Sequence, residues 1–205
     1  VIETASRAGK HDDLVRYLQM ARKTLREPAI DTELAVAYAK TDRLRDMEDF
    51  LSMTNVADLL SAGEKAFDAE LYDAAKLLFS NISNWARLAT TLIYLGENQA
   101  AVDAARKAGN TQVWRQVNAA CIDKKEFRLA QICGLNLVVH AEELSALVRL
   151  YEYQGYTDEL MALLEAGLGL ERAHMGMFTE LSVLYAKVRR RPPLTRSDPL
   201  EETRS

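Results

Sequence analysis

Breaks between short helical stretches recur about every 30 residues along this chain. They fall near Gly9, Thr41, Ala69, Gly96, Lys125 and Gly155. Each interval has room for two helices, and one such hairpin cannot bury its apolar face alone. Stacked hairpins can bury it in one continuous core. The period therefore predicts an all-α chain, an α-α superhelix (α-solenoid) of about six stacked helix-turn-helix repeats.

Apolar residues inside these intervals follow helical spacing. Residues 141–153 carry one stripe at i, i+3, i+4 and i+7, formed by Leu144, Leu147, Val148 and Tyr151. Residues 12–26 repeat the pattern with Leu14, Leu18, Ala21 and Leu25. Small residues replace the stripe at Ala100, Ala101, Ala104, Ala105 and Ala108. The first two stretches are predicted to be amphipathic helices, and the alanine face predicts a close approach of two helix backbones.

Local signals mark where some of these helices begin and end. Pro28 is predicted to stop the helix of residues 12–26, because proline disfavours helix in the residue before it. Asn84 is a predicted N-cap for a helix over Trp85–Leu95. Thr157 or Asp158 is predicted to start a helix over 159–168.

Composition and charge divide the chain near Lys187. The sequence holds 9 Gly and 4 Pro in 205 residues, too few for the many turns of an all-β fold. Pro28 is the one proline before residue 192, whereas Pro192, Pro193 and Pro199 fall in the last fourteen residues. Residues 1–186 carry a net charge of −7 and residues 187–205 one of +3. We expect a helical-repeat segment over 1–187 and a basic, Pro-rich, disordered tail over 188–205.

The acidic body gives no electrostatic case for binding nucleic acid or anionic lipid.

The two cysteines, Cys121 and Cys133, lie in apolar helical patterns and are predicted to be buried free thiols rather than a disulfide framework. No apolar run approaches the length of a membrane span and no signal peptide is visible. We expect a cytoplasmic chain, and the start at Val1 suggests an excerpt of a longer protein.

No arrangement of residues in the sequence points to catalysis, to a cofactor or to a metal. The histidines His11, His140 and His174 lie in different units, and none has a second His or Cys at i+3 or i+4. Cys121 has no His beside it that would make it a nucleophile. Gly167 and Gly169 lack the third glycine and the preceding strand of a nucleotide-binding loop.

Two further groups of residues have a functional and a structural interpretation. The acidic pairs Glu142-Glu143 and Asp12-Asp13 could be acid–base carboxylates, but at helix N-termini they are better explained as charges that compensate the helix dipole. The run Met175–Phe178 could form an adaptable interface, and helix core is the preferred interpretation.

The run Arg189-Arg190-Arg191-Pro192-Pro193 leaves several alternatives open. It could bind anionic lipid or RNA, or be a Pro-rich ligand for a peptide-binding module. The preferred interpretation is an unstructured, solvated end.

Several strings of the body resemble the clathrin heavy-chain family over about residues 5–187. They are Tyr17–Lys23, Tyr72–Leu78, Leu95–Glu97 with Gln99–Asp103, Lys125–Gln131, Val138–Leu144 and, most specifically, Gly169–Leu181. The resemblance implies a stacked-hairpin leg segment near the knee and proximal leg of a three-legged unit, whose legs interdigitate into a lattice around budding vesicles. After Lys187 the chain departs from the family, which continues with helical hairpins; the sequence does not say where this tail originates.

The resemblance implies a structural role in vesicle-mediated protein transport and endocytosis, on the cytoplasmic face of coated pits and vesicles. Implied partners are other clathrin heavy chains through leg–leg contacts and, less directly, clathrin light chain, with membrane association only through the coat. The net charge of −7 predicts that assembly strengthens as pH falls and carboxylates are protonated. The sequence identifies no contact residue for these partners.

Two rival functions belong to other classes. A tetratricopeptide-like or vesicle-tethering adaptor would bind a peptide in a groove with clustered Lys, Arg or Asn, although the 34-residue period of the former is not found. An enzyme built on a helical toroid would need an inward acidic or His cluster, and the sequence has none. We therefore expect a protein that is not an enzyme.

Overall fold

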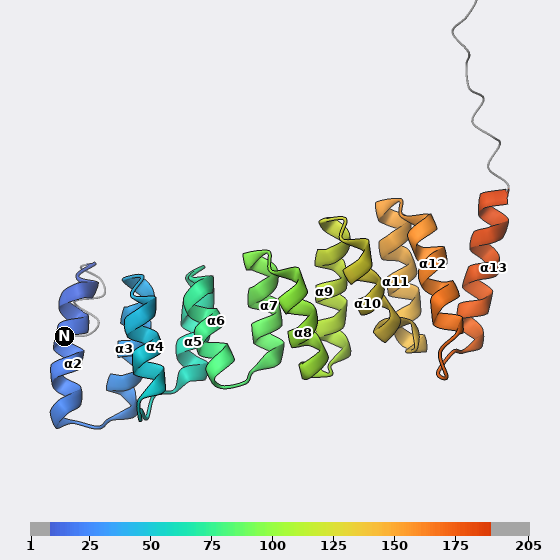
Figure 1. Cartoon of the computed structure of the whole chain (residues 1–205). Coiled ribbons are helices and arrows are strands. Elements are labelled where there is room, and N and C mark those ends of the chain that lie inside the picture. Colours follow the sequence, from blue (N-terminus) through green and yellow to red (C-terminus); the bar gives the residue numbers. More distant parts are fainter. Residues whose placement is uncertain (1–8, 190–205) are drawn as a thin grey trace, which may run out of the picture. The chain divides into compact units, whose positions relative to one another are not determined.

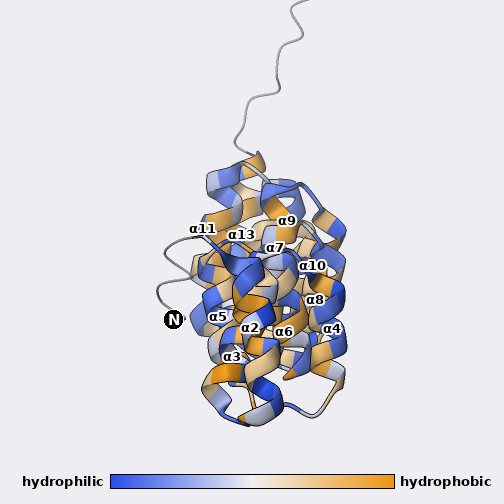
Figure 2. Cartoon of the chain, turned by 90° about the vertical axis from the view of Figure 1, so that its left-hand side faces the viewer, coloured by the Kyte–Doolittle hydropathy of each residue, from blue (hydrophilic) through white to orange (hydrophobic). Residues whose placement is uncertain are grey.

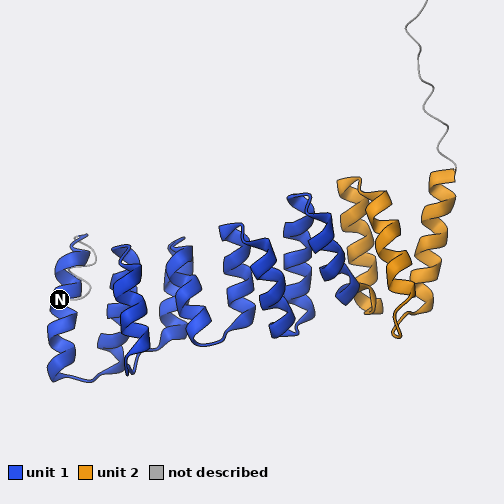
Figure 3. Cartoon of the chain, in the orientation of Figure 1, with its two compact units in different colours: residues 1–137 blue, residues 138–205 orange. Residues whose placement is uncertain are grey.

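A computed structural model describes residues 9–189, and this part contains twelve helices and no strand. The helices are α2 (His11–Thr24), α3 (Pro28–Lys40), α4 (Leu44–Ser52), α5 (Leu59–Asp68), α6 (Tyr72–Asn81), α7 (Trp85–Leu95), α8 (Asn98–Ala108), α9 (Thr111–Asp123), α10 (Phe127–Val138), α11 (Ala141–Gln154), α12 (Thr157–Leu168) and α13 (Met175–Arg189). The chain divides into two compact units, residues 1–137 and residues 138–205 (Figure 3).

Unit 1 is a series of stacked helical hairpins that follow one another in chain order (Figure 1). Helices pair within each hairpin, as α5 does with α6 and α7 with α8. Successive hairpins stack first helix on first helix, α3 on α5 and α7 on α9, and second on second, α4 on α6. Contacts therefore join each repeat to its neighbours, and the predicted α-solenoid is confirmed.

The repeat period has a local backbone cause. The first helix of each hairpin ends at a residue in the left-handed conformation, namely Asp42, Glu70, Gly96, Lys125 and Gly155. The next residue then donates its N–H to a carbonyl five positions back, for example Leu71 to Ala66 at 2.9 Å and Tyr156 to Tyr151 at 2.9 Å. This is the Schellman arrangement, which satisfies terminal carbonyls and reverses the chain. The predicted joints agree with these turns to within one residue.

The predicted helix ends are only partly confirmed. Asn84 caps α7 as predicted, because its Oδ1 accepts the N–H of Arg87 at 3.2 Å. The helix predicted over 159–168 is confirmed and begins at Thr157, one of the two predicted starting residues, although its N-cap is Tyr156, which makes no side-chain cap. Pro28 does not end the preceding helix, which stops at Thr24; it is the first residue of α3. Proline suits that position because the missing N–H has no partner there in any helix.

The core of unit 1 lies on the facing sides of the stacked helices. Figure 2 shows hydrophobic and hydrophilic residues on the same helices, as expected where one face is buried. Ala101, Ala104 and Ala105 of the predicted small-residue face are buried. A second close approach occurs at Gly63, where an added Cβ would lie 2.6 Å from Cε1 of the buried Phe79.

Unit 2 consists of α11, α12 and α13, and each of these three helices packs on the other two. Its buried residues include Leu147, Leu163 and Met177. Helix α13 continues through Val188 to Arg189, past the predicted end of the helical segment at residue 187. The rest of the predicted disordered tail lies outside the described residues, so that boundary stays a prediction. None of the helices in residues 9–189 combines the length and apolar character that crossing a membrane requires.

Candidate functional site

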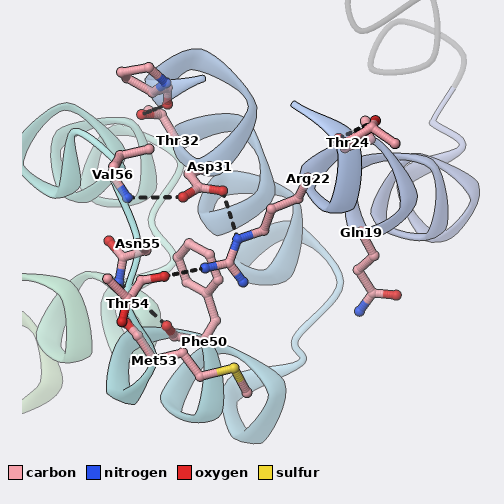
Figure 4. Close-up of polar contacts among 12 residues, drawn as sticks. Gln19, Arg22, Thr24, Asp31, Thr32, Phe50, Met53, Thr54, Asn55 and Val56 are labelled. Atoms are coloured by element: carbon pink, nitrogen blue, oxygen red, sulfur yellow. Dashed lines mark hydrogen bonds and ion pairs between the residues drawn. The ribbon is translucent and has the colours of Figure 1, made fainter. Parts of the chain in front are cut away.

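The most connected polar group of unit 1 joins α2, α3, α4 and the loop before α5. Arg22 of α2 reaches across to this loop, where its Nη2 donates to the carbonyl oxygen of Thr54 at 2.7 Å (Figure 4). Its Nε lies 2.9 Å from Oδ1 of Asp31 in α3. Its guanidinium carbon lies 4.7 Å from the ring centroid of Phe50 in α4, a cation–π geometry. One side chain thus fastens three helices and a loop, and we call Arg22, Asp31, Phe50, Thr54 and Val56 the Arg22 cluster.

Asp31 is the unusual member of this cluster because its carboxylate is almost fully buried, with a residue exposure of 3%. Its Oδ2 accepts the N–H of Val56 at 2.9 Å. Its Oδ1 has the ion pair with Arg22 but no hydrogen bond of good geometry within the described part of the chain. A buried charge is tolerated only when it is paired, so Asp31 depends on Arg22.

The neighbouring Thr32 fixes the other end of the same loop. Its Oγ1 accepts the N–H of Asp58 at 2.8 Å and donates to the carbonyl oxygen of Pro28 at 2.7 Å. Two adjacent side chains of α3 therefore bind the middle and the end of the connection between α4 and α5, which has no regular secondary structure of its own.

A hollow of about 750 Å³ opens beside the Arg22 cluster. Its lining includes Arg22 and Lys23 from the end of α2, Arg26 just after that helix, and Asp46 and Asp49 from α4. No histidine or cysteine belongs to this lining. The lining therefore combines basic and acidic side chains that can form charge pairs.

The structure does not bring the three histidines together. His11 begins α2, and its Nδ1 is buried without a hydrogen bond in the described region. His140 precedes α11 and lies 3.7 Å from Glu142, and Nε2 of His174 lies 2.9 Å from the carbonyl oxygen of Val138. Among residues 9–189, no three His, Cys, Asp or Glu side chains are grouped to hold a metal ion.

The cysteines are buried free thiols, as predicted. The thiol of Cys133 donates a hydrogen bond to Cys121, and this bond together with burial raises the pKa of Cys133 well above its ordinary value. The same bond lowers the pKa of Cys121, which accepts it. Both side chains are fully shielded from solvent, so neither is placed as a nucleophile.

The acidic pairs lie where the structural interpretation expects them. Asp12 and Asp13 are in the first turn of α2, and Glu142 and Glu143 are in the first turn of α11. Negative charge is favourable there because the helix dipole is positive at that end. Asp12 additionally lies 3.5 Å from Arg43.

The two remaining candidates have mixed outcomes. Gly167 is buried, and an added Cβ would clash with Cε of Met177, so this glycine serves helix packing. The core interpretation of Met175–Phe178 holds for Met177 but is wrong for Met175 and Phe178, which are 76% and 47% exposed. Of the Arg189–Pro193 run, Arg189 ends α13 and the rest lies outside the described residues.

The Arg22 cluster is the feature that the sequence analysis missed. Its members are up to 34 residues apart, and Arg22 alone looks like any charged helical residue. One local signal was present: Asp31 lies between Ile30 and Leu34, which share a helical face, and α3 buries all three residues. A lone carboxylate on a buried face calls for a basic partner.

Comparisons with known proteins agree with this architecture. A family model described as "Clathrin: Region in Clathrin and VPS" matches residues 1–129 and 135–193. Over 187 residues the chain is 62% identical to a probable clathrin heavy chain of Schizosaccharomyces pombe, 59% to the clathrin heavy chain of Drosophila melanogaster and 55% to clathrin heavy chain 2 of Homo sapiens. These alignments cover 91% of this chain but 11% of each relative.

Proposed function

The chain belongs to the clathrin repeat family, and from this premise we propose that it is a structural segment of a clathrin-type coat. In this role the stacked hairpins supply a leg segment, and many weak contacts between such legs hold a lattice together. The observation that carries the proposal is the family match over residues 1–129 and 135–193, which includes every hairpin of unit 1 apart from residues 130–134.

The physical features of the chain are compatible with a scaffold. Each hairpin buries its apolar face against its neighbours, which makes a repeat array resist bending locally. Weak lateral contacts, repeated along many legs, then add up through multivalency. A scaffold of this kind needs surfaces rather than a catalytic pocket, and the buried thiols and separated histidines described above fit a chain that is not an enzyme.

Partners and location follow from the same proposal. The partners are other clathrin heavy chains through leg–leg contacts, with clathrin light chain as a further candidate along this segment. Membrane association is indirect, through coated pits and vesicles on the cytoplasmic side. The process served is vesicle-mediated protein transport, including endocytosis.

A chimera tests the proposal. Residues 1–187 of this chain replace the matching segment of the Schizosaccharomyces pombe relative, which is 62% identical to this chain over 187 aligned residues. We expect the purified chimera to assemble into lattices that sediment like those of the parent heavy chain. A chimera that is folded and forms its three-legged unit, yet stays in the supernatant under conditions where the parent assembles, would contradict the proposal.

One observation favours a second candidate, an adaptor that binds a peptide. The hollow beside the Arg22 cluster gathers Lys23, Arg26 and Asn55. An acidic peptide is the expected ligand of such a wall, although Asp46 and Asp49 opposite would oppose it. Fluorescence anisotropy with a labelled poly-glutamate peptide, on the parent and on a K23E/R26E variant, decides the matter: binding that the variant loses supports the adaptor.

A further inference from the structure

A cluster of three aromatic rings lies at the surface of unit 1, away from the Arg22 cluster. The rings of Tyr72 and Tyr94 are stacked, with centroids 5.0 Å apart and planes 11° from parallel. Phe67 meets both edge-on, each at 5.4 Å. Tyr94 is 60% exposed although it lies in the interior of the repeat array, on α7. Exposed aromatic rings that are already held in place by their neighbours lose little entropy when a partner binds.

Three carboxylates stand beside these rings. A hollow of about 160 Å³ is lined by Asp42, Glu70 and Asp73 together with Tyr72 and Leu95. Within residues 9–189 none of the three carboxylates is paired with a Lys or Arg, whereas Lys76 nearby is paired with Glu97 at 2.7 Å. Partial burial raises the pKa of Tyr72, and the charge of Glu70 raises it further. We call Asp42, Glu70, Tyr72, Asp73 and Tyr94 the acidic tyrosine surface.

Two of these carboxylates occupy positions where glycine would be the easier choice. Asp42 and Glu70 have φ angles of 54° and 61°, in the left-handed region. The equivalent turns of other hairpins use Gly96 and Gly155. A side chain in this conformation costs stability, and Glu gains none of the local hydrogen bonding that makes Asn and Asp tolerable there. The fold alone therefore does not require an acid at Glu70.

We propose that the acidic tyrosine surface binds the basic, proline-containing segment Arg189–Pro193 of a second copy of this chain. The choice of this segment rests on charge complementarity, because the surface carries three carboxylates and the segment carries three arginines followed by two prolines. Guanidinium groups pair with carboxylates and stack on aromatic faces. Proline rings also dock on tyrosine faces, because an extended Pro-containing segment loses little entropy on binding. This contact goes beyond the proposed scaffold role and does not depend on it.

The experiment measures binding in trans. A fluorescein-labelled peptide of residues 186–199 is titrated with the full chain, and anisotropy is read at low and at physiological salt. We expect saturable binding that weakens as salt rises, since the contact is partly electrostatic. A peptide with Arg189, Arg190 and Arg191 changed to Gln should bind about tenfold more weakly. A peptide with Pro192 and Pro193 changed to Ala should also bind more weakly.

Variants of the protein separate binding from folding. Tyr94→Ala removes an exposed ring and should weaken binding about tenfold. Glu70→Gly removes a carboxylate and relieves the left-handed strain, so the chain should melt no lower than the parent while binding about threefold more weakly. Lys125→Gly is the control for the backbone effect: it also places glycine at a left-handed turn, where φ is 60°, in the α9–α10 hairpin, but it removes no carboxylate. That variant should bind the peptide as the parent does.

Three results would overturn the proposal. The first is no binding at about 1 mM peptide, a concentration at which even a weak specific contact is populated. The second is unchanged affinity of either altered peptide. The third is an equal weakening by Glu70→Gly and Lys125→Gly, which would mean that placing glycine at a left-handed turn, rather than losing a carboxylate of this surface, weakens binding. None of these outcomes bears on lattice assembly by the chimera, so the two proposals fail separately.

Discussion

Removal of either charge from the Arg22–Asp31 pair should destabilise the first hairpins of unit 1. The Asp31 side chain is 4% exposed and the Arg22 side chain is 24% exposed. Arg22→Ala leaves a buried carboxylate with one hydrogen bond, so we expect a loss of about 3 kcal/mol, the low end for a broken buried pair. Asp31→Ala leaves Arg22 bound to the Thr54 carbonyl, stacked on the Phe50 ring and partly hydrated, so the free energy of unfolding should fall by about 2 kcal/mol.

The double variant tests whether the two residues act together. Because each single change already removes the pair, the double variant should lose about 1–2 kcal/mol less than the sum of the single losses. The matched control is Lys65→Ala, which removes a more exposed ion pair between Lys65 and Glu33 at 2.7 Å, again reaching α3 from a neighbouring element. That pair should contribute less than about 1 kcal/mol.

Urea unfolding gives the total losses, and hydrogen exchange locates them. Repeat arrays open locally, so the amides of α2 and of the loop at residues 53–58 should exchange faster in Arg22→Ala, with α7 and α8 unaffected. An important role for the buried pair is contradicted if Arg22→Ala lowers the free energy of unfolding no more than Lys65→Ala does. It is also contradicted if the losses of the two single variants add up to the loss of the double variant.

Four further predictions concern packing, thiols and charge. Gly63→Ala should cost about 1–3 kcal/mol in urea unfolding because its Cβ would meet Phe79, and adding Phe79→Leu should recover part of the loss. Cys121 and Cys133 should react with a thiol reagent only after unfolding; rapid reaction in the native chain would contradict their burial. The pKa of Tyr185 is raised because its hydroxyl donates to the carboxylate of Glu165. This hydrogen bond should therefore stabilise the fold below the ordinary tyrosine pKa, and the stabilisation should be lost as pH rises through the raised value. Ultraviolet titration of the parent and of Tyr185→Phe measures the pKa. Lattice assembly of the chimera should strengthen as pH falls, because protonation reduces the net charge of −7 on residues 1–186, and sedimentation showing the opposite trend would refute it.

The repeat architecture could be predicted from sequence because its causes are local. The left-handed turn residues, such as Gly96 and Gly155, and the helical spacing of apolar residues each lie within one hairpin. The start of α12 at Thr157 was one of the two predicted positions, but no side chain caps this helix, whose N-cap is Tyr156. The preference for Thr and Asp at N-caps therefore located the start of α12 but did not identify its N-cap residue.

Features that depend on neighbouring helices were harder to predict. Helical spacing alone does not say which side of α13 a neighbour covers, so Met177 is buried while Met175 and Phe178 are exposed. The Arg22 cluster joins residues from α2, α3 and the loop before α5, and only the stacked structure brings them together. The acidic tyrosine surface likewise combines two hairpin turns with a residue of α7.

A cryo-EM map of lattices assembled from the chimera tests the central claim most directly. We expect residues 9–187 to be traceable as the stacked hairpins described above, with neighbouring legs packed alongside them in the lattice. A map of well-formed lattices in which this segment is unfolded, or makes no contact with any neighbouring leg, would contradict it.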